Sequence, residues 1–458
     1  MKTLSWVCPA QYNNLSLSRS SLQAKDRLCR SRLTATYRRP SQPLGVHTGR
    51  TAPSIRANVS TDTLAPVAQL GRRVLVGGTT FVVGFRGIAS LVVAGLPQPP
   101  PLPKGGFTDE VGVYETRIGE DVNLPLRTRI FYPSQDSSSA NAIAVNERSL
   151  TRSDATVAPY FPAGAAVSEG IASLVSFPRF LLAHLATASS GCVHNAAPLP
   201  PPTSSPSAKL PVIVYSHGFG GNADMACYAM RRMAASGMVV VALEHQDGSA
   251  SHATDHLGNP IKFDGGSLGL QRRSQEVLTV GASIKTGKAM ASGEIAEELS
   301  RIMDTDNVFV GGHSYGCPTA LLACQASKDL FRGAVLHDPA ITADSMASQG
   351  GCPVPAVYLL GDGYAGNARI RAGVAKALSG SAPNSSAWHI LGAEHGNFVD
   401  APMWAPLWVM RNIPFIPAAG AADPVQVHDV LGTSSQAFMS QRFKALETLP
   451  LMKNLGSA

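Results

Sequence analysis

Apolar runs alternate with amphipathic segments over most of the chain. Runs rich in valine, isoleucine, leucine and aromatic residues predict strands at residues 111–115, 126–132, 212–215, 239–243, 308–311, 334–336, 356–360 and 388–391. Segments with helical periodicity predict helices at residues 224–236, 271–284, 292–303 and 318–325. Because strands that alternate with helices usually build parallel sheets, the pattern predicts an α/β fold with a mostly parallel central sheet flanked by helices.

Two longer apolar segments do not fit this alternation. Residues 74–96 are long enough to span a bilayer, but five glycines and the central Arg86 make spanning costly. We therefore favour association with a membrane surface, or packing on the domain, for this segment. Residues 171–185 precede the proline-rich stretch 198–206 and predict a lid-like insertion near residues 160–206, with core packing as the alternative.

The domain organisation follows from length and pattern together. A chain of 458 residues has room for two or three average domains. The alternating pattern instead indicates one enlarged α/β domain at residues 107–446. An apolar segment and proline-rich linker at residues 58–106 precede it, and a tail at residues 447–458 follows.

The first 57 residues differ in composition from the rest. They are rich in serine, threonine and arginine and carry ten Lys or Arg against the single acid Asp26, a net charge of +9. Subtracting this from the net charge of the whole chain, +7, leaves −2 for the remainder, which gives no indication of nucleic-acid binding. Basic, acid-poor segments without an apolar core are typical of transit peptides, so residues 1–57 predict import into the chloroplast, with the mitochondrion as the alternative.

Residues 312–316, Gly-His-Ser-Tyr-Gly, carry the clearest chemical signal. They follow a predicted strand and precede a predicted helix, which is the context in which G-x-S-x-G forms a nucleophile elbow. The same pattern surrounds Ser267 at residues 265–269, but polar residues precede it instead of a buried strand, so we interpret that copy as a loop. Ser314 is therefore the candidate nucleophile.

A serine nucleophile needs a base and an acid that orients the base, and in this fold class they follow the serine in the order acid, histidine. His395 comes just after the predicted strand 388–391 and is the candidate base, whereas His389 lies within that strand and is expected to pack. Asp338 and Asp362 each end a predicted strand, where the ligand-facing side chains of α/β sheets gather. The residues alone leave the choice of acid open between these two.

Two backbone N–H groups are needed to hold the negative charge that develops on the substrate oxygen. One is expected from Tyr315, the residue after the nucleophile. The other is expected from the glycine-rich stretch 217–221, which follows the predicted strand 212–215 and in which we choose Phe219.

No pattern in the chain indicates a cofactor or a metal ion. His252, Asp255 and His256 are ligand types, but no full ligand set is visible, and we interpret them as a polar loop. Seven cysteines, five of them after residue 57, include no C-x-x-C pair and predict reduced, buried thiols.

These motifs together resemble the platelet-activating factor acetylhydrolases. The resemblance rests on residues 215–220, on the Glu-His-x-Asp-x-Ser-Ala run at 244–250, on the elbow and on residues 395–398, and it covers residues 107–446 with gaps. Members of this family are α/β-hydrolase esterases that remove short or oxidised acyl groups from the sn-2 position of phospholipids. The resemblance implies that fold, with Ser314 as nucleophile, His395 as base and no metal.

The family pattern also bears on the acid. Aligning the helix after Ser314 puts His337 at the acid position, and a shift of one residue restores Asp338, which the following Pro339 also favours. Asp362 stands where most other α/β-hydrolases carry their acid, so it stays the alternative. Residues 315–318, Tyr-Gly-Cys-Pro, replace the more usual aromatic-Gly-Gly.

The resemblance implies a serine esterase that acts on a phospholipid or another lipid ester at a membrane surface, through an acyl-enzyme. Another plastid carboxylesterase, such as a chlorophyllase-like enzyme, would share the fold and the candidate residues. A non-catalytic lipid binder with the hydrolase fold is the alternative from a different class, and the intact elbow, base and loop argue against it.

Overall fold

The computed structural model describes residues 99–102, 106–119, 125–135, 157–199, 209–264, 269–288, 293–412 and 419–458. The predicted transit peptide at residues 1–57, the apolar segment at 74–96 and Ser267 lie outside these ranges. Expectations on those residues therefore stay predictions.

Strands and helices alternate through the described part of the chain. The strands are β1 (Val111–Ile118), β2 (Leu126–Pro133), β3 (Val157–Pro159), β4 (Ser189–His194), β5 (Leu210–Ser216), β6 (Val239–Leu243), β7 (Met303–His313), β8 (Ala334–His337), β9 (Ala356–Leu360), β10 (Ser386–Ile390) and β11 (Met452–Ser457). The α-helices are α2 (Ala165–Leu174), α3 (Cys227–Ala235), α4 (Leu270–Lys285), α5 (Glu294–Ile302), α6 (Gly316–Ala326), α7 (Asp362–Gly366), α8 (Ala368–Ser379), α9 (Leu407–Asn412) and α10 (Pro424–Met439). Short 3-10 helices are η3 (Arg179–Leu181), η4 (Ala183–Thr187), η5 (Met346–Ser348), η6 (His395–Phe398), η7 (Ala401–Met403) and η8 (Phe443–Thr448).

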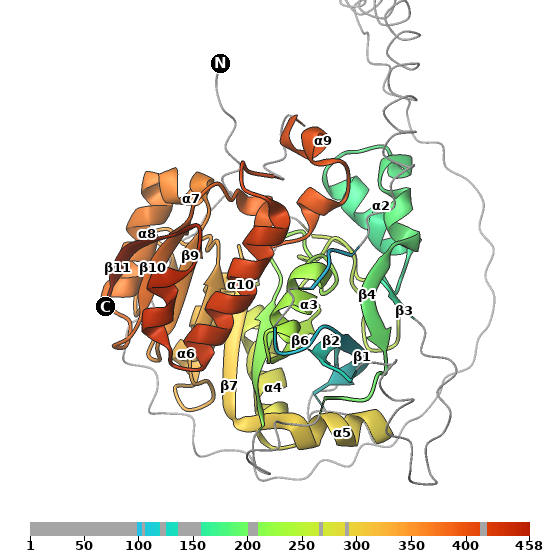
Figure 1. Ribbon diagram of the computed structural model, residues 1–458, viewed down its shortest axis with the longest axis horizontal. Helices are drawn as coiled ribbons and strands as arrows, with labels where there is room; N and C mark the ends of the chain where they lie inside the picture. Colours follow the sequence, from blue (N-terminus) through green and yellow to red (C-terminus); the bar gives the residue numbers. More distant parts are fainter. Residues whose placement is uncertain are drawn as a thin grey trace, which may run out of the picture. The chain divides into compact units, whose positions relative to one another are not determined.

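All these strands form one sheet in the order β11-β10-β9-β8-β7-β5-β6-β2-β1-β4-β3. The six central strands from β10 to β6 are parallel to their neighbours. Antiparallel pairs occur toward the two edges, where β11 joins β10, β2 joins β6 and β1 joins β2. The prediction of a mostly parallel sheet flanked by helices is confirmed (Figure 1).

The central strands are apolar on both faces because helices cover both. On β5, Ile213 and Tyr215 pack in one core with residues of α2, α3 and α10. Val212 and Val214 pack in the second core with residues of α4, α5, α6 and α8. A strand buried on both faces reads as a continuous apolar run, which is why the sequence located these strands within a few residues.

The edges of the sheet differ from the expected organisation. Residues 447–458, expected as a tail, include β11, which pairs with β10 and extends the sheet. The expected insertion near residues 160–206 folds as α2, η3, η4 and β4, and β4 joins the sheet beside β1. Its side chains are mixed in burial: Leu185 is fully buried, whereas Phe180 is 52 % exposed.

Two further findings concern segments with special chemistry. Within the described ranges, no helix has both the length and the apolar character that a membrane span requires. The five cysteines there, Cys192, Cys227, Cys317, Cys324 and Cys352, are all buried free thiols.

Candidate active site

Ser314 occupies a sharp turn between β7 and α6. Its backbone φ is 56°, in the left-handed region that side-chain-bearing residues rarely adopt. The turn needs glycine on both sides: a Cβ on Gly312 would lie 2.5 Å from the carbonyl group of Gly316, and a Cβ on Gly316 would collide with the carbonyl oxygen of Ser216. The Ser314 N–H donates to the His337 carbonyl oxygen over 3.0 Å. The turn therefore has the shape of a nucleophile elbow and leaves Ser314 half-buried.

Asp338 and His395 form a close pair next to this turn. The Asp338 Oδ2 atom lies 2.6 Å from His395 Nδ1, and Asp338 Oδ1 accepts the Gly361 N–H over 2.8 Å. Asp338 follows β8 with a φ of 47°, so it shares the left-handed backbone of Ser314 on the neighbouring strand end. Its carboxylate is buried, whereas the His395 side chain is 25 % exposed. The geometry thus brings a buried acceptor to one nitrogen of an imidazole whose ring is open to the pocket.

Asp362 and His337, the two rivals for the acid position, contact other groups. Asp362 Oδ1 lies 2.7 Å from His389 Nε2 and accepts the Gly392 N–H over 3.0 Å. His337 is fully buried, and its Nδ1 lies 2.8 Å from the Tyr215 hydroxyl. Burial lowers the pKa of His337 to about 3, so this ring is neutral in the folded protein.

The His395 ring is held between two aromatic rings. Its centroid lies 4.5 Å from that of His313 and 4.7 Å from that of Tyr364. Burial, and then the neighbouring His395, hold the pKa of His313 well below its usual range, so His313 is a neutral neighbour. His395 is the first residue of the short helix η6, and a capping box between Glu394 and Asn397 stabilises the start of this helix.

The glycine-rich loop 217–221 lies directly beside the elbow. A Cβ on Gly218 would lie 3.1 Å from Ser314 Cβ, a tight contact that the glycine avoids. The loop's backbone is tied to the segment after β6, because Gly220 N–H donates to Ser249 O over 2.8 Å and Ser251 N–H donates to Gly221 O over 3.1 Å. The ring of Phe219 lies 6.2 Å from that of Tyr315, so the two expected N–H donors come from segments in contact.

Ser314, His395 and the glycine-rich loop line one pocket. Its empty volume, including the open mouth, is about 740 Å³. The apolar part of its wall includes Leu174 of α2 together with Met225, Met230 and Val399. Leu174 also packs against Gly220, whose φ is 72°. A Cβ on Gly220 would collide with the Leu174 side chain. The insertion therefore forms one wall of the pocket.

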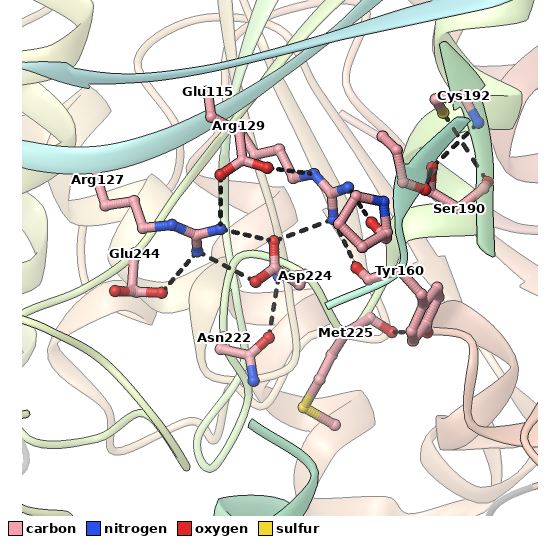
Figure 2. Close-up of polar contacts among 12 residues, drawn as sticks. Glu115, Arg127, Arg129, Tyr160, Ser190, Cys192, Asn222, Asp224, Met225 and Glu244 are labelled. Atoms are coloured by element: carbon pink, nitrogen blue, oxygen red, sulfur yellow. Dashed lines mark hydrogen bonds and ion pairs between the residues drawn. The ribbon is translucent and has the colours of Figure 1, made fainter. Parts of the chain in front are cut away.

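A network of buried charges supports the loop just after the glycine-rich stretch. Figure 2 shows the Asp224 carboxylate between the guanidinium groups of Arg127 and Arg129, with Glu244 on the far side of Arg127. Burial alone would raise the pKa of Asp224, but the two arginines hold it below its usual value. Because Asn222, Ala223, Met225 and Ala226 line the pocket, this network supports one wall of the site.

Sequence reasoning missed several charged residues around the site that are buried or largely buried, namely Arg127, Arg129, Asp224, Arg273, Glu276 and Asp400. Asp400 is an example: its Oδ2 accepts the Tyr228 N–H at 2.7 Å and the Tyr160 hydroxyl at 2.8 Å, and burial raises its pKa to about 7. The Glu-His-x-Asp-x-Ser run was a signal for such a network, because buried charges need partners of opposite sign.

The side chains first considered for a metal belong to a turn. Asp255 Oδ1 accepts the backbone N–H groups of Leu257 and Asn259 over 2.9 and 2.8 Å. In the part of the chain that the structure describes, no group of three or more His, Cys, Asp or Glu side chains is arranged to hold a metal ion.

Two comparisons with known proteins give a match. The family model described as "Platelet-activating factor acetylhydrolase, isoform II" matches residues 101–261 and 270–448. A ferulic acid esterase from Streptomyces cinnamoneus has a similar fold, with a TM-score of 0.54 at 17 % identity, over 79 % of this chain and 100 % of that one. Comparison with curated protein sequences gives no significant match. The similar structure shows the fold, and the family model confirms the resemblance found in the sequence.

Proposed function

The chain belongs to the platelet-activating factor acetylhydrolase isoform II family, and we propose that it hydrolyses the sn-2 acyl ester of phospholipids with short or oxidised chains. The observation that carries this proposal is the meeting of three groups at one apolar pocket. Ser314 of the elbow and the imidazole of His395 line the pocket, and the buried Asp338 lies 2.6 Å from that imidazole.

The proposed reaction has two steps. Ser314 Oγ attacks the ester carbonyl while His395 Nε2 takes its proton, and the N–H groups of Phe219 and Tyr315 hold the oxyanion. His395 then gives the proton to the departing lysophospholipid alkoxide, which leaves an acyl-enzyme. Water, activated by the same imidazole, attacks the acyl-enzyme and releases the fatty acid and free Ser314.

Asp338 has a specific task in this scheme. Because its carboxylate accepts the hydrogen bond from His395 Nδ1, the proton of the neutral imidazole stays on Nδ1, and Nε2 is the free base. The same carboxylate stabilises the imidazolium that forms when Ser314 loses its proton. Asp338 cannot easily turn away, because its second oxygen accepts the Gly361 N–H.

The pocket wall supports an acyl chain as the group bound next to Ser314. Met225, Met230 and Leu174 are apolar and flexible, which suits an aliphatic chain more than a charged group. On the side of α2 the Leu174 side chain lies against Gly220, and we expect this wall to favour short or truncated chains.

The nucleophile is the first test of the proposal. Ser314→Ala should abolish ester hydrolysis and labelling by a fluorophosphonate probe, because the chemistry is lost while the packing is kept. Ser267→Ala, at the second copy of the pattern, is the matched control and should hydrolyse at the wild-type rate. Loss of activity in Ser267→Ala with normal activity in Ser314→Ala would contradict the assignment.

The substrate class needs a separate measurement. Hydrolysis of phosphatidylcholines with sn-2 chains of graded length should be fastest for acetyl and short oxidised chains. An enzyme that hydrolyses soluble carboxylic esters but none of these lipids would be a carboxylesterase of another specificity. A folded protein that neither hydrolyses esters nor reacts with the fluorophosphonate would be a lipid binder instead.

We also propose that the enzyme is imported into the chloroplast and acts at a membrane surface. The basic, acid-poor residues 1–57 support import, and a reporter fused to them should enter plastids; retention in the cytosol or entry into mitochondria would contradict this.

The exposed rings of Phe180 on η3 and Trp408 on α9 support surface binding. Replacing both with serine should weaken sedimentation with phospholipid vesicles and leave hydrolysis of a soluble ester unchanged.

A further inference from the structure

The Glu-His-x-Asp-x-Ser run at residues 244–249 surrounds a buried arginine that the proposed mechanism does not use. Arg273 of α4 is fully buried. Its guanidinium group donates to Ser249 Oγ, to Ser216 Oγ over 3.3 Å and to the carbonyl oxygen of His217. Ser249 in turn donates to Asp247, whose Oδ1 lies 4.0 Å from Arg273 and balances its charge.

The same guanidinium group also contacts the elbow. Arg273 Nε donates to Thr319 Oγ1 over 3.2 Å, and the guanidinium carbon lies 5.3 Å from the centre of the Tyr315 ring. Thr319 is on α6, one turn after Tyr315, and its hydroxyl donates to the Tyr315 carbonyl oxygen. Arg273 therefore contacts both segments that supply the expected oxyanion donors.

The contacts with the glycine-rich loop lie at its two anchor points. His217 begins the loop, and its carbonyl oxygen accepts a hydrogen bond from Arg273. Ser249 holds the middle of the loop, because its carbonyl oxygen accepts the Gly220 N–H. Phe219 lies between these anchors, so the position of its N–H depends on both.

A chain of hydrogen bonds fixes Ser216 as an acceptor for Arg273. The Oε1 atom of Glu276 accepts hydrogen bonds from the Gln246 N–H and from Arg272 Nε. Its Oε2 atom lies 2.6 Å from His245 Nδ1 and accepts the proton that this nitrogen carries. The Nε2 of His245 then has no proton and accepts the Ser216 hydroxyl proton over 2.7 Å. The arrangement has the connectivity of a catalytic triad, but Ser216 and His245 are fully buried, so it is structural.

We propose that Arg273 is a positioning residue that holds the loop of Phe219 and the elbow of Tyr315 at the separation needed to stabilise the oxyanion. This inference rests on the proposed esterase function. Only a guanidinium group supplies this many donors in one rigid plane, and here all three of its nitrogen atoms are used. Oxyanion donors act only when they are already aimed at the developing charge, so loosening either segment lowers the rate more than substrate binding.

The test compares Arg273→Lys with the same change at Arg301, which is exposed on α5 and contacts Glu297. For a soluble short-chain ester, Arg273→Lys should lower kcat by roughly 10²- to 10³-fold, as does loss of one oxyanion donor, with KM changed little. Its affinity for a trifluoromethyl ketone, which forms a tetrahedral adduct with Ser314, should fall by the same factor as kcat/KM. Arg301→Lys should match the wild type in both measurements.

Several outcomes would overturn the inference. A folded Arg273→Lys protein with wild-type kcat and ketone affinity would do so, and so would a loss of folded protein with normal kcat per folded molecule. If Arg273→Lys does not fold, Thr319→Val and Ser249→Ala each remove one contact, and normal kcat and ketone affinity in both would equally overturn it. A wild-type protein that neither hydrolyses esters nor labels at Ser314 would contradict the proposed function itself.

Discussion

Two carboxylate–imidazole pairs lie at neighbouring strand ends of this molecule, and they differ in burial and in access to the pocket. Asp338, which follows β8, has its Oδ2 atom 2.6 Å from Nδ1 of His395. Asp362, which follows β9, has its Oδ1 atom 2.7 Å from Nε2 of His389. Asp338 is buried and its imidazole lines the pocket beside Ser314. The Asp362 side chain is 43 % exposed, and its partner His389 lies on strand β10.

The difference shows why Asp338, and not Asp362, is the candidate acid of this site. A short contact between a carboxylate and an imidazole occurs in both pairs, so the contact alone carries no functional information. The two pairs differ in the surroundings of the imidazole ring. The ring of His395 lines a cavity that a substrate can enter, whereas His389 lies on strand β10 and does not line that cavity.

The largest expected effect is the loss of turnover in Asp338→Asn. An asparagine side chain can donate to His395 Nδ1 and so favours the wrong tautomer, in which Nε2 carries the proton. In the best-studied triad this change costs roughly 10⁴-fold in kcat, and we expect a similar loss here. The measurement is hydrolysis of a soluble short-chain ester at equal concentrations of folded protein, with Asp362→Asn as the matched control.

The candidate site was predictable only where the signal is local. Ser314 stands in a five-residue pattern between an apolar strand and a helix, and His395 follows the last central strand, so both could be located from the sequence. Asp338 and Asp362 occupy the same kind of position, and only the fold decides which of them meets His395. The position of each aspartate relative to His395 depends on the register between β8 and β9, which no local pattern encodes.

The same limit applies to the fold. Strands buried on both faces, such as β5 and the second half of β7, were predicted because their apolar runs are continuous. In contrast, β11 is largely exposed and polar, and it exists because its backbone pairs with β10. Arg129 and Arg273 are both fully buried beside carboxylates from distant segments, and no local pattern marks such a pairing.

His337, next to the proposed acid, sharpens the comparison through pH. Its pKa is about 3 in the folded protein against 6.5 in the unfolded chain, so the unfolded chain takes up the proton first as the pH falls. The free energy of unfolding should therefore decrease between pH 6.5 and 3, by at most about 1.4 kcal/mol per pH unit from this residue.

His337→Gln removes this titration and keeps a polar partner for Tyr215. Urea unfolding at pH 7.5 and 5 should show a smaller difference for the variant than for the wild type, and turnover at pH 8 should stay within about tenfold. Equal pH dependence in the two proteins would contradict the buried, neutral state of His337. A collapse of turnover like that of Asp338→Asn would return His337 to the candidate acids.

The smallest effect is expected at the second pair. Asp362→Asn keeps an oxygen that can accept the Gly392 N–H and weakens only a half-exposed contact with His389, so we expect a loss of about 1 kcal/mol or less in unfolding free energy. Turnover should change less than about twofold, because neither side chain reaches Ser314 or the pocket, and His389→Gln should behave alike. A double-mutant cycle in urea would measure their coupling directly. Near-normal turnover in Asp338→Asn, with a collapse in Asp362→Asn, would move the acid one strand later and would mean that His395 changes its partner when substrate binds.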